Sequence, residues 1–226
     1  MIIQHREWAQ LYPGASVGIL IMKGVENIAA HKKLNLAKRE LEAALRDKYM
    51  NLSRNAIKAS HPIDLYAAYY KKFGNSYHVL LQLESVAKGK SIPTVSALVE
   101  AMFMAELKNI LLTAGHDLEK LSFPLEGKLS TGNEEYTGIN GKEVSTVQND
   151  MMIADAGGII SSIIKGPDSR TRISLDTSQV LFTVYALPGI KESLVCQHLD
   201  DIETYVRLVS AQSITAIKKV ADPMDF

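Results

Sequence analysis

Several patterns that would assign this chain to a familiar class are missing. A single cysteine, Cys196, rules out an intramolecular disulfide framework and fits a reducing compartment, so we expect a cytoplasmic protein. Cys196 itself, beside apolar helical positions, is predicted to be a small buried side chain. The apolar run 17–22 is too short to cross a bilayer, and the amino terminus lacks the apolar stretch of a signal peptide. We therefore expect no membrane association.

An excess of charge of one sign is also missing. Lys and Arg total 25 and Asp and Glu total 25, so no global field draws the chain onto a phosphate backbone. We expect no DNA binding, and we expect any contact with RNA to be local.

Motifs for metals and nucleotides are missing as well. The six histidines are scattered, without a His-x-x-x-His or Cys-x-x-Cys pair, and no Gly-x-x-x-x-Gly-Lys loop is present. We expect no metal, no cofactor and no activation of amino acids.

What the sequence does contain is helical periodicity in its first half and strand-like runs in its second half. The turn pairs Asn140-Gly141 and Gly157-Gly158 and the triplet 166–168 separate the later runs. The pattern predicts helices at 35–49, 62–74, 77–88, 94–115 and 191–210, and strands at 16–23, 125–129, 135–139, 151–154, 158–165 and 180–186. We expect one domain over residues 1–226 with an α+β fold, an antiparallel meander with helices packed on one side.

The helix expected at 94–115 carries the most informative pattern. Its apolar stripe includes Met102, and Glu106 falls near the middle of that stripe with Asn109 beside it. A carboxylate in this position has two readings. It is a desolvated group that acts as a general base or grips an amine, or it is half of a structural salt bridge with a Lys or Arg.

Other polar residues are candidates with open alternatives. His116 and Asp117, expected to close the same helix, are either a proton relay or a helix-terminal pair. One of Ser161 and Ser162 should point into any cavity that the sheet encloses, but neither lies in a Gly-x-Ser-x-Gly elbow. The four tyrosines from Tyr66 to Tyr77 fit the core better than a base-stacking surface.

A polar turn between two expected strands offers charged groups close together. Asp168, Arg170, Thr171 and Arg172 put two guanidinium groups and a carboxylate on one turn. This is either a clamp for a carboxylate or phosphate or a self-paired surface turn.

Two long segments carry a family resemblance. The first, 92–121, reads IPTVSALVEAMFMAELKNILLTAGHDLEKL, with a Pro-containing loop, a helix and a Gly-x-Asp-Leu exit at 115–118. The second, 151–189, has an Ala-Asp-x-x-Gly hairpin at 154–158 and an Asp-x-Arg-Thr turn at 168–171. In order and spacing they resemble the B3/B4 domain family of the phenylalanyl-tRNA synthetase β subunit, over nearly the whole chain, as a free-standing member. Ser96 stands where many editing members carry asparagine.

The resemblance implies a tRNA-editing activity. In the synthetase, the domain hydrolyses the ester of tyrosine wrongly attached to the tRNA for phenylalanine. We expect an aminoacyl-tRNA deacylase or, alternatively, a non-catalytic module that binds a small amino compound or an RNA end. We predict catalytic roles for Glu106 and His116. We predict substrate-binding roles for Ser96, Asn109, Asp117, Ser161, Ser162, Asp168, Arg170, Thr171 and Arg172.

Overall fold

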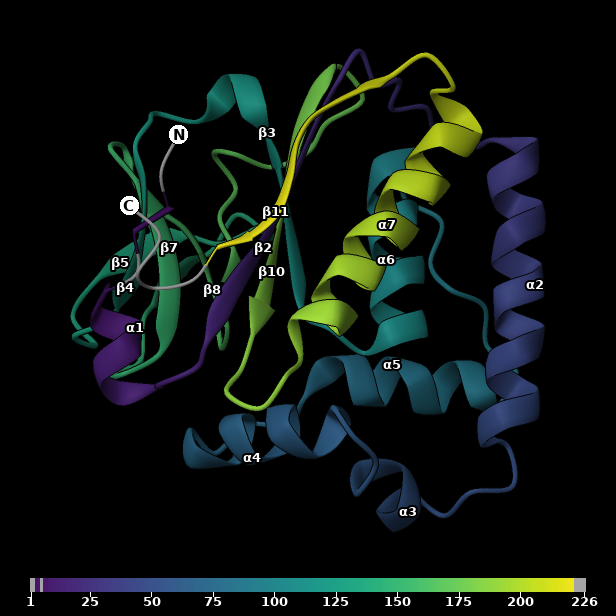
Figure 1. Ribbon diagram of the computed structural model, residues 1–226, viewed down its shortest axis with the longest axis horizontal. Helices are drawn as coiled ribbons and strands as arrows, with labels where there is room; N and C mark the ends of the chain where they lie inside the picture. The colour runs from purple at the N-terminus through teal and green to yellow at the C-terminus, as the bar shows by residue number, and fades with distance from the viewer. Residues whose placement is uncertain (1–2, 5, 222–226) are drawn as a thin grey trace.

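The chain forms two main sheets that pack against each other, with most of the helices on the outer face of one of them (Figure 1). The structure, a computed structural model, describes residues 3–4 and 6–221. The helices are α1 Arg6–Leu11, α2 Lys32–Tyr49, α3 Arg54–Lys58, α4 Ile63–Lys72, α5 His78–Ala87, α6 Ala97–Asn109, the 3-10 turn η1 Leu118–Lys120, and α7 Glu192–Val209. The strands are β1 Ile3–Gln4, β2 Ser16–Lys23, β3 Thr113–Asp117, β4 Leu125–Leu129, β5 Glu135–Thr137, β6 Glu143–Ser145, β7 Met151–Asp155, β8 Gly158–Ser162, β9 Gly166–Pro167, β10 Gln179–Ala186 and β11 Ile214–Ala221.

The four-stranded sheet holds the centre of the molecule. Its order is β11-β2-β10-β3, and every neighbouring pair is antiparallel. β2 is buried along all but its last residue, because α6 and α7 cover one face of this sheet and the second sheet lies on the other (Figure 1). The predicted strands at 16–23 and 180–186 are confirmed.

The five-stranded sheet has the order β1-β4-β7-β8-β9. From β4 to β9 the strands follow one another along the chain as an antiparallel meander, with the β5–β6 hairpin set aside as a separate ribbon, and β1 joins β4 in parallel. The predicted α+β class with antiparallel strands is confirmed. The strands divide between two sheets because the apolar central strands need cover on both faces.

The four tyrosines from Tyr66 to Tyr77 belong to the core, as predicted. Each hydroxyl reaches an acceptor, which a buried tyrosine requires. The pairs are Tyr66 with the Tyr185 carbonyl (2.5 Å), Tyr69 with the Asp150 carboxylate (2.8 Å), Tyr70 with the Ile163 carbonyl (2.8 Å) and Tyr77 with the Ile110 carbonyl (3.3 Å). The first three bonds tie α4 to strand β10 and to residues that flank β7 and β8, and the fourth ties the start of α5 to the end of α6.

The helix predicted at 94–115 is wrong at its carboxyl end. α6 stops at Asn109 because Ile110 adopts a left-handed conformation with φ 57°, and the chain reverses into β3. Gly115 therefore lies inside a strand, where a Cβ atom would come within 2.7 Å of Ile173 Cδ1. His116 and Asp117 are strand residues, not a helix terminus.

Two smaller predictions are also corrected. The turn expected at 166–168 lies at 163–165, because Gly166–Pro167 pairs with β8 as β9. Cys196 is exposed on α7 and not buried, because it lies one position off the stripe that faces the sheet. In the part of the chain that the structure describes, no helix is both long and apolar enough to span a membrane.

Close packing between α7 and β2 leads to a prediction about stability. A Cβ atom on Gly18 would lie 2.6 Å from Val195 Cγ1 and 3.0 Å from Val184 Cβ. Gly18→Ala should therefore lower the free energy of unfolding by about 1–3 kcal/mol, measured by urea denaturation. In a Val195→Ala background the same change should cost less, because the closest clash is removed. Equal losses in both backgrounds would show that this contact does not set the spacing of helix and sheet.

Candidate functional site

A cavity of about 590 Å³ opens between α6, the edge strand β3 and the β8–β9 turn. Its walls are mainly apolar, with few polar groups, which is the usual composition of a small-molecule site. The lining residues are His78, Gln82, Val95, Val99, Met102, Phe103, Glu106, Leu112, Thr113, Ala114, Gly115, Ile139, Ser161, Ser162, Ile163, Ile164, Lys165, Gly166, Pro167, Arg172, Ile173 and Tyr185.

Glu106 lies in the wall of this cavity with only 2% of its surface exposed. The reversal at Ile110 turns the backbone of β3 toward α6, so that the Thr113 N–H donates to Glu106 Oε1 at 2.8 Å. The other carboxyl oxygen, Oε2, has no hydrogen-bond partner among the described residues. One oxygen of the carboxyl group is therefore held by backbone, and the other remains for a ligand or water.

No Lys, Arg or His within the described ranges forms an ion pair with Glu106. The structural salt bridge considered for this residue is therefore not formed. Burial raises the pKa of Glu106 to about 8, and the hydrogen bond from Thr113 opposes this shift. Around neutral pH the group exists in both protonation states, which suits a general base.

We expected one of Ser161 and Ser162 to point into a cavity, and both line this one. The Ser161 hydroxyl lies 2.6 Å from the Tyr185 hydroxyl, which also donates to the Ser161 carbonyl at 3.1 Å. Ser162 Oγ accepts the Lys165 N–H at 3.1 Å and fixes the β8–β9 turn. No histidine is hydrogen-bonded to either serine among the described residues, so neither is set up as an activated nucleophile.

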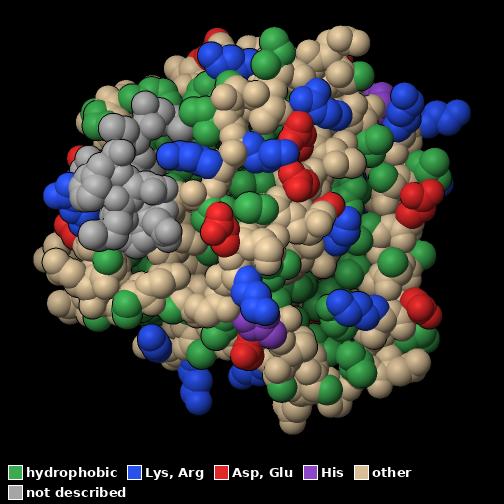
Figure 2. Space-filling view, viewed as in Figure 1, with side chains coloured by type: hydrophobic (Ala, Val, Ile, Leu, Met, Phe, Trp, Pro, Cys, Tyr) green, Lys and Arg blue, Asp and Glu red, His purple; other side chains and the backbone are tan. Residues whose placement is uncertain are grey.

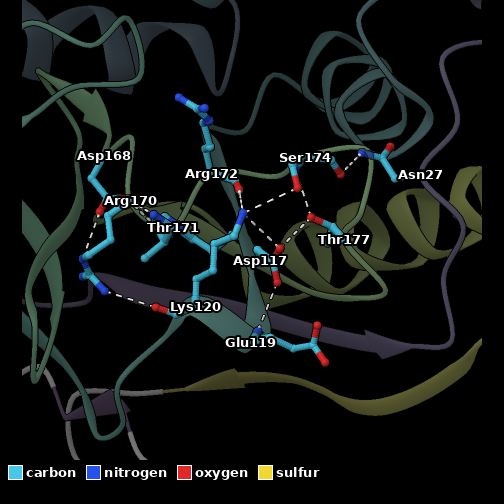
Figure 3. A network of polar contacts seen from close by, with 11 residues as sticks. Asn27, Asp117, Glu119, Lys120, Asp168, Arg170, Thr171, Arg172, Ser174 and Thr177 are labelled. Atoms are coloured by element: carbon cyan, nitrogen blue, oxygen red, sulfur yellow. Dashed lines mark hydrogen bonds and ion pairs between the residues drawn. The ribbon is translucent and has the colours of Figure 1, made fainter.

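The rim of the cavity is cationic. Lys165 and Arg172 line it, both are exposed, and neither side chain forms an ion pair with any described residue. In Figure 3 the guanidinium group of Arg172 extends away from the polar network around its backbone. These two cations are available to an anionic group that enters the opening.

The other residues of the polar turn are engaged within the protein, but the alternative of a self-paired surface turn holds only in part, because Asp168 and Thr171 are buried and Arg170 reaches Asp155 on β7. Arg170 makes two hydrogen bonds to Asp155, at 2.7 and 3.0 Å, and its Nε lies 3.5 Å from Asp168 Oδ2. Thr171 donates to Asp168 from both its hydroxyl and its N–H. Burial opposes ionisation of Asp155, but the bonds from Arg170 and two backbone N–H groups hold its pKa below the usual range. Of the two guanidinium groups, only that of Arg172 faces the cavity.

His116 and Asp117 do not line the cavity. His116 is fully buried on β3, with Nδ1 2.8 Å from Thr171 Oγ1 and no partner for Nε2, and burial lowers its pKa to about 3. Asp117 accepts from Thr177 at 2.8 Å and pairs with Lys120 at 3.2 Å (Figure 3). The helix-terminal placement behind the relay hypothesis is wrong, and neither side chain reaches the cavity.

Ser96 and Asn109 also lie outside the cavity lining. Ser96 is the buried N-cap residue of α6, without a capping hydrogen bond from its side chain. Asn109 turns toward α7, where it donates to Asp201 at 2.9 Å and lies 3.3 Å from His198 Nδ1. Within the described ranges, no three His, Cys, Asp or Glu side chains gather in a way that could hold a metal ion.

Several lining residues were not singled out by sequence reasoning. Val99, Met102, Phe103 and Glu106 share one face of α6, so the helical periodicity that identified Glu106 also contained its apolar neighbours. Tyr185, from β10, carries no comparable signal, because it enters the site through pairing between distant strands.

The buried carboxyl gives a test of its protonation state. In the folded protein the pKa of Glu106 rises from 4.5 to about 8. The folded state therefore binds the proton more tightly, and stability falls as pH rises between these values, by at most about 1.4 kcal/mol per pH unit. The free energy of unfolding of Glu106→Gln, measured by urea denaturation, should equal that of the wild type near pH 4.5 and should be larger near pH 8. If the unfolding free energies of the wild type and of Glu106→Gln changed in the same way with pH, Glu106 would be ionised in the folded protein over this range.

The two arginines of the turn form a matched pair. Arg170→Gln removes a two-bonded partner of Asp155 and should lower the free energy of unfolding by about 1–2 kcal/mol. Arg172→Gln removes an exposed side chain without an ion pair and should change the free energy of unfolding by less than about 0.5 kcal/mol. Thermal and urea unfolding of both variants measure this, and equal losses would contradict the division of roles.

No family model matches the sequence, and no curated protein matches it either. Among solved structures, the chain is similar to an N-terminal fragment of the phenylalanyl-tRNA synthetase β-subunit from Pyrococcus horikoshii, with 12% sequence identity and a TM-score of 0.45. The alignment covers 97% of this chain and 52% of that one, so the chain spans about half the length of the fragment. A likeness at this level carries no information about activity.

Proposed function

We propose that the cavity binds the aminoacyl end of a charged tRNA and that Glu106 promotes hydrolysis of its ester bond. The observation that carries this proposal is a buried carboxyl group without a cationic partner, in the wall of an apolar cavity. Buried carboxylates are rare unless they are paired or functional. The resemblance of 92–121 and 151–189 to the B3/B4 editing domains supplies the class of substrate.

The chemistry needs only water and this chain's own residues. Ionised Glu106 takes a proton from a water molecule, and the hydroxide forms a new C–O bond at the ester carbonyl carbon. The bond between the carbonyl carbon and the ribose oxygen breaks, and this oxygen takes the proton back from Glu106 as it leaves. The amino acid and the tRNA 3′ hydroxyl are the products. The apolar face of α6 at Val99 and Phe103 is placed to hold the amino-acid side chain.

The charges of the site suit such a substrate. The partly ionised carboxyl of Glu106 lies in the wall of the cavity, and Lys165 and Arg172 lie at its exposed rim. An aminoacyl-tRNA end carries an ammonium group next to the ester and phosphates beyond the terminal ribose. The amino acid would lie inside, and the phosphates would lie toward the two cations.

The experiment measures release of amino acid from a panel of correctly and wrongly charged tRNAs. Glu106→Gln should lower kcat/KM by about 100-fold or more, because the amide cannot accept the proton. Glu100→Gln is the matched control on the same helix. Its carboxylate is buried but paired with Lys38 at 2.7 Å, so activity per folded molecule should persist. Activity of Glu106→Gln equal to the wild type would end the catalytic assignment.

The pH dependence adds an independent prediction. The base acts when ionised, so kcat/KM should rise with pH along a limb whose midpoint follows the pKa of about 8. The rising limb should be absent from the residual activity of Glu106→Gln. A wild-type profile that is flat between pH 6 and 9 would exclude Glu106 as the base.

A second function is favoured by the state of the serines. Because the Ser161 hydroxyl is engaged by Tyr185 and Ser162 Oγ accepts the Lys165 N–H, neither serine is activated by a neighbouring base among the described residues. A non-catalytic module that binds a small amino compound or an RNA end through the same cavity fits this observation. Binding of an uncharged tRNA or free amino acid without turnover of any ester in the panel would favour this function.

A further inference from the structure

A second opening, distinct from the cavity, lies between α3, α4 and α5. It is a cleft of about 410 Å³ whose polar lining comes chiefly from Arg54, Lys58, Lys71, Asn55 and Asn75. No acidic residue lines it. Lys58 and Lys71 form no ion pair with any described residue, whereas Arg54 pairs with Glu84 at 3.0 Å. The cleft therefore presents uncompensated positive charge.

The charge of this region stands out from the rest of the chain. Residues 54–90 contain six lysines and arginines and two acidic residues, and the remaining sequence contains 19 and 23. Residues 54–90 thus carry a net charge of +4, and the remaining sequence carries −4. On the face of α7 and β11, by contrast, basic and acidic side chains are interspersed (Figure 2) and paired, as Lys218 is with Asp200 and Glu203.

The helix α5 separates the cleft from the cavity. His78 and Gln82 on α5 line the cavity, and Leu80 and Leu81 on the same helix line the cleft. A helix of ten residues is about 15 Å long and roughly 10 Å wide, so the two openings lie within that range of each other. His78 and Leu81 are exposed, which leaves an open surface between the openings.

We propose that this cleft binds phosphates of the RNA strand whose aminoacylated end occupies the cavity, so that the strand crosses the outer face of α5. The inference rests on the proposed function, which places the RNA end in the cavity. Lys165 at the rim is the first cation on this path, and Lys58 and Lys71 follow beyond α5. His78 offers an exposed ring on which a base of the strand can stack.

This arrangement explains how a chain without net charge binds a polyanion. Each phosphate that a lysine neutralises releases a counterion, so affinity falls as salt rises. The few cations on the path predict weak, strongly local binding, with specificity left to the cavity. The RNA is single-stranded in this region, because only an unpaired RNA end fits into a cavity of this size.

The test compares two double variants with the same change in charge. Lys58→Gln with Lys71→Gln removes both unpaired cations of the cleft, and Lys32→Gln with Lys33→Gln removes two exposed cations at the start of α2. The probe is a fluorescent single-stranded RNA ending in CCA, titrated by anisotropy at several salt concentrations. The cleft variant should bind about tenfold more weakly, and its salt slope should be smaller by about 1.4. The α2 variant should match the wild type.

The outcomes separate this inference from the catalytic proposal. Glu100→Gln, which lies outside both openings, should bind the RNA as the wild type does. Lysine-dependent RNA binding without ester hydrolysis by the wild type would support the cleft and overturn catalysis. Hydrolysis that depends on Glu106, with equal RNA binding by both double variants, would overturn the cleft alone. Equally tight, equally lysine-dependent binding of heparin would overturn the assignment to RNA.

Discussion

The hydrogen bond from the Thr113 N–H to Glu106 joins the helical layer to the central sheet, and the site depends on it. It forms because Ile110 adopts a left-handed conformation that ends α6 and sends the chain back as β3. The same reversal places β3 at the edge of its sheet, where it leaves room for a cavity beside the β8–β9 turn. One hydrogen bond from the backbone to a side chain thus fixes the position of the carboxyl group beside the opening.

The sequence predicted the elements whose signal is local. Buried strands such as Ser16–Lys23 and amphipathic helices such as Lys32–Tyr49 follow from periodicity, because one residue type repeats at one spacing. The end of α6 could not be predicted, since a β-branched residue such as Ile110 rarely adopts positive φ and nothing nearby marks a stop. The helical periodicity therefore runs on into residues that form β3.

The site was predictable only where it lies within one element. Glu106 stood out because a carboxylate interrupts an apolar stripe, and the structure places it in the cavity wall. The surroundings of His116 and Asp117 could not be predicted, because their partners lie 55 and 60 residues later in the chain. Lys165 lies in the β8–β9 turn, whereas Arg172 pairs with His116 of β3, so two separate strand pairings bring these cations to the rim. That these two side chains meet follows from the strand topology, and their spacing in the sequence does not reveal it.

The cavity has two walls that belong to different layers. The face of α6 is built into the core, where a change of one methylene group already disturbs packing. The turn at 163–165, opposite, is held by hydrogen bonds that its own backbone N–H groups donate, from Lys165 to Ser162 Oγ and from Ile164 to Asp150 Oδ2. Substitutions in this turn can therefore alter the shape of the opening while the wall that holds the carboxyl stays in place. The architecture separates the part of the pocket that is free to diverge during evolution from the part that must remain constant.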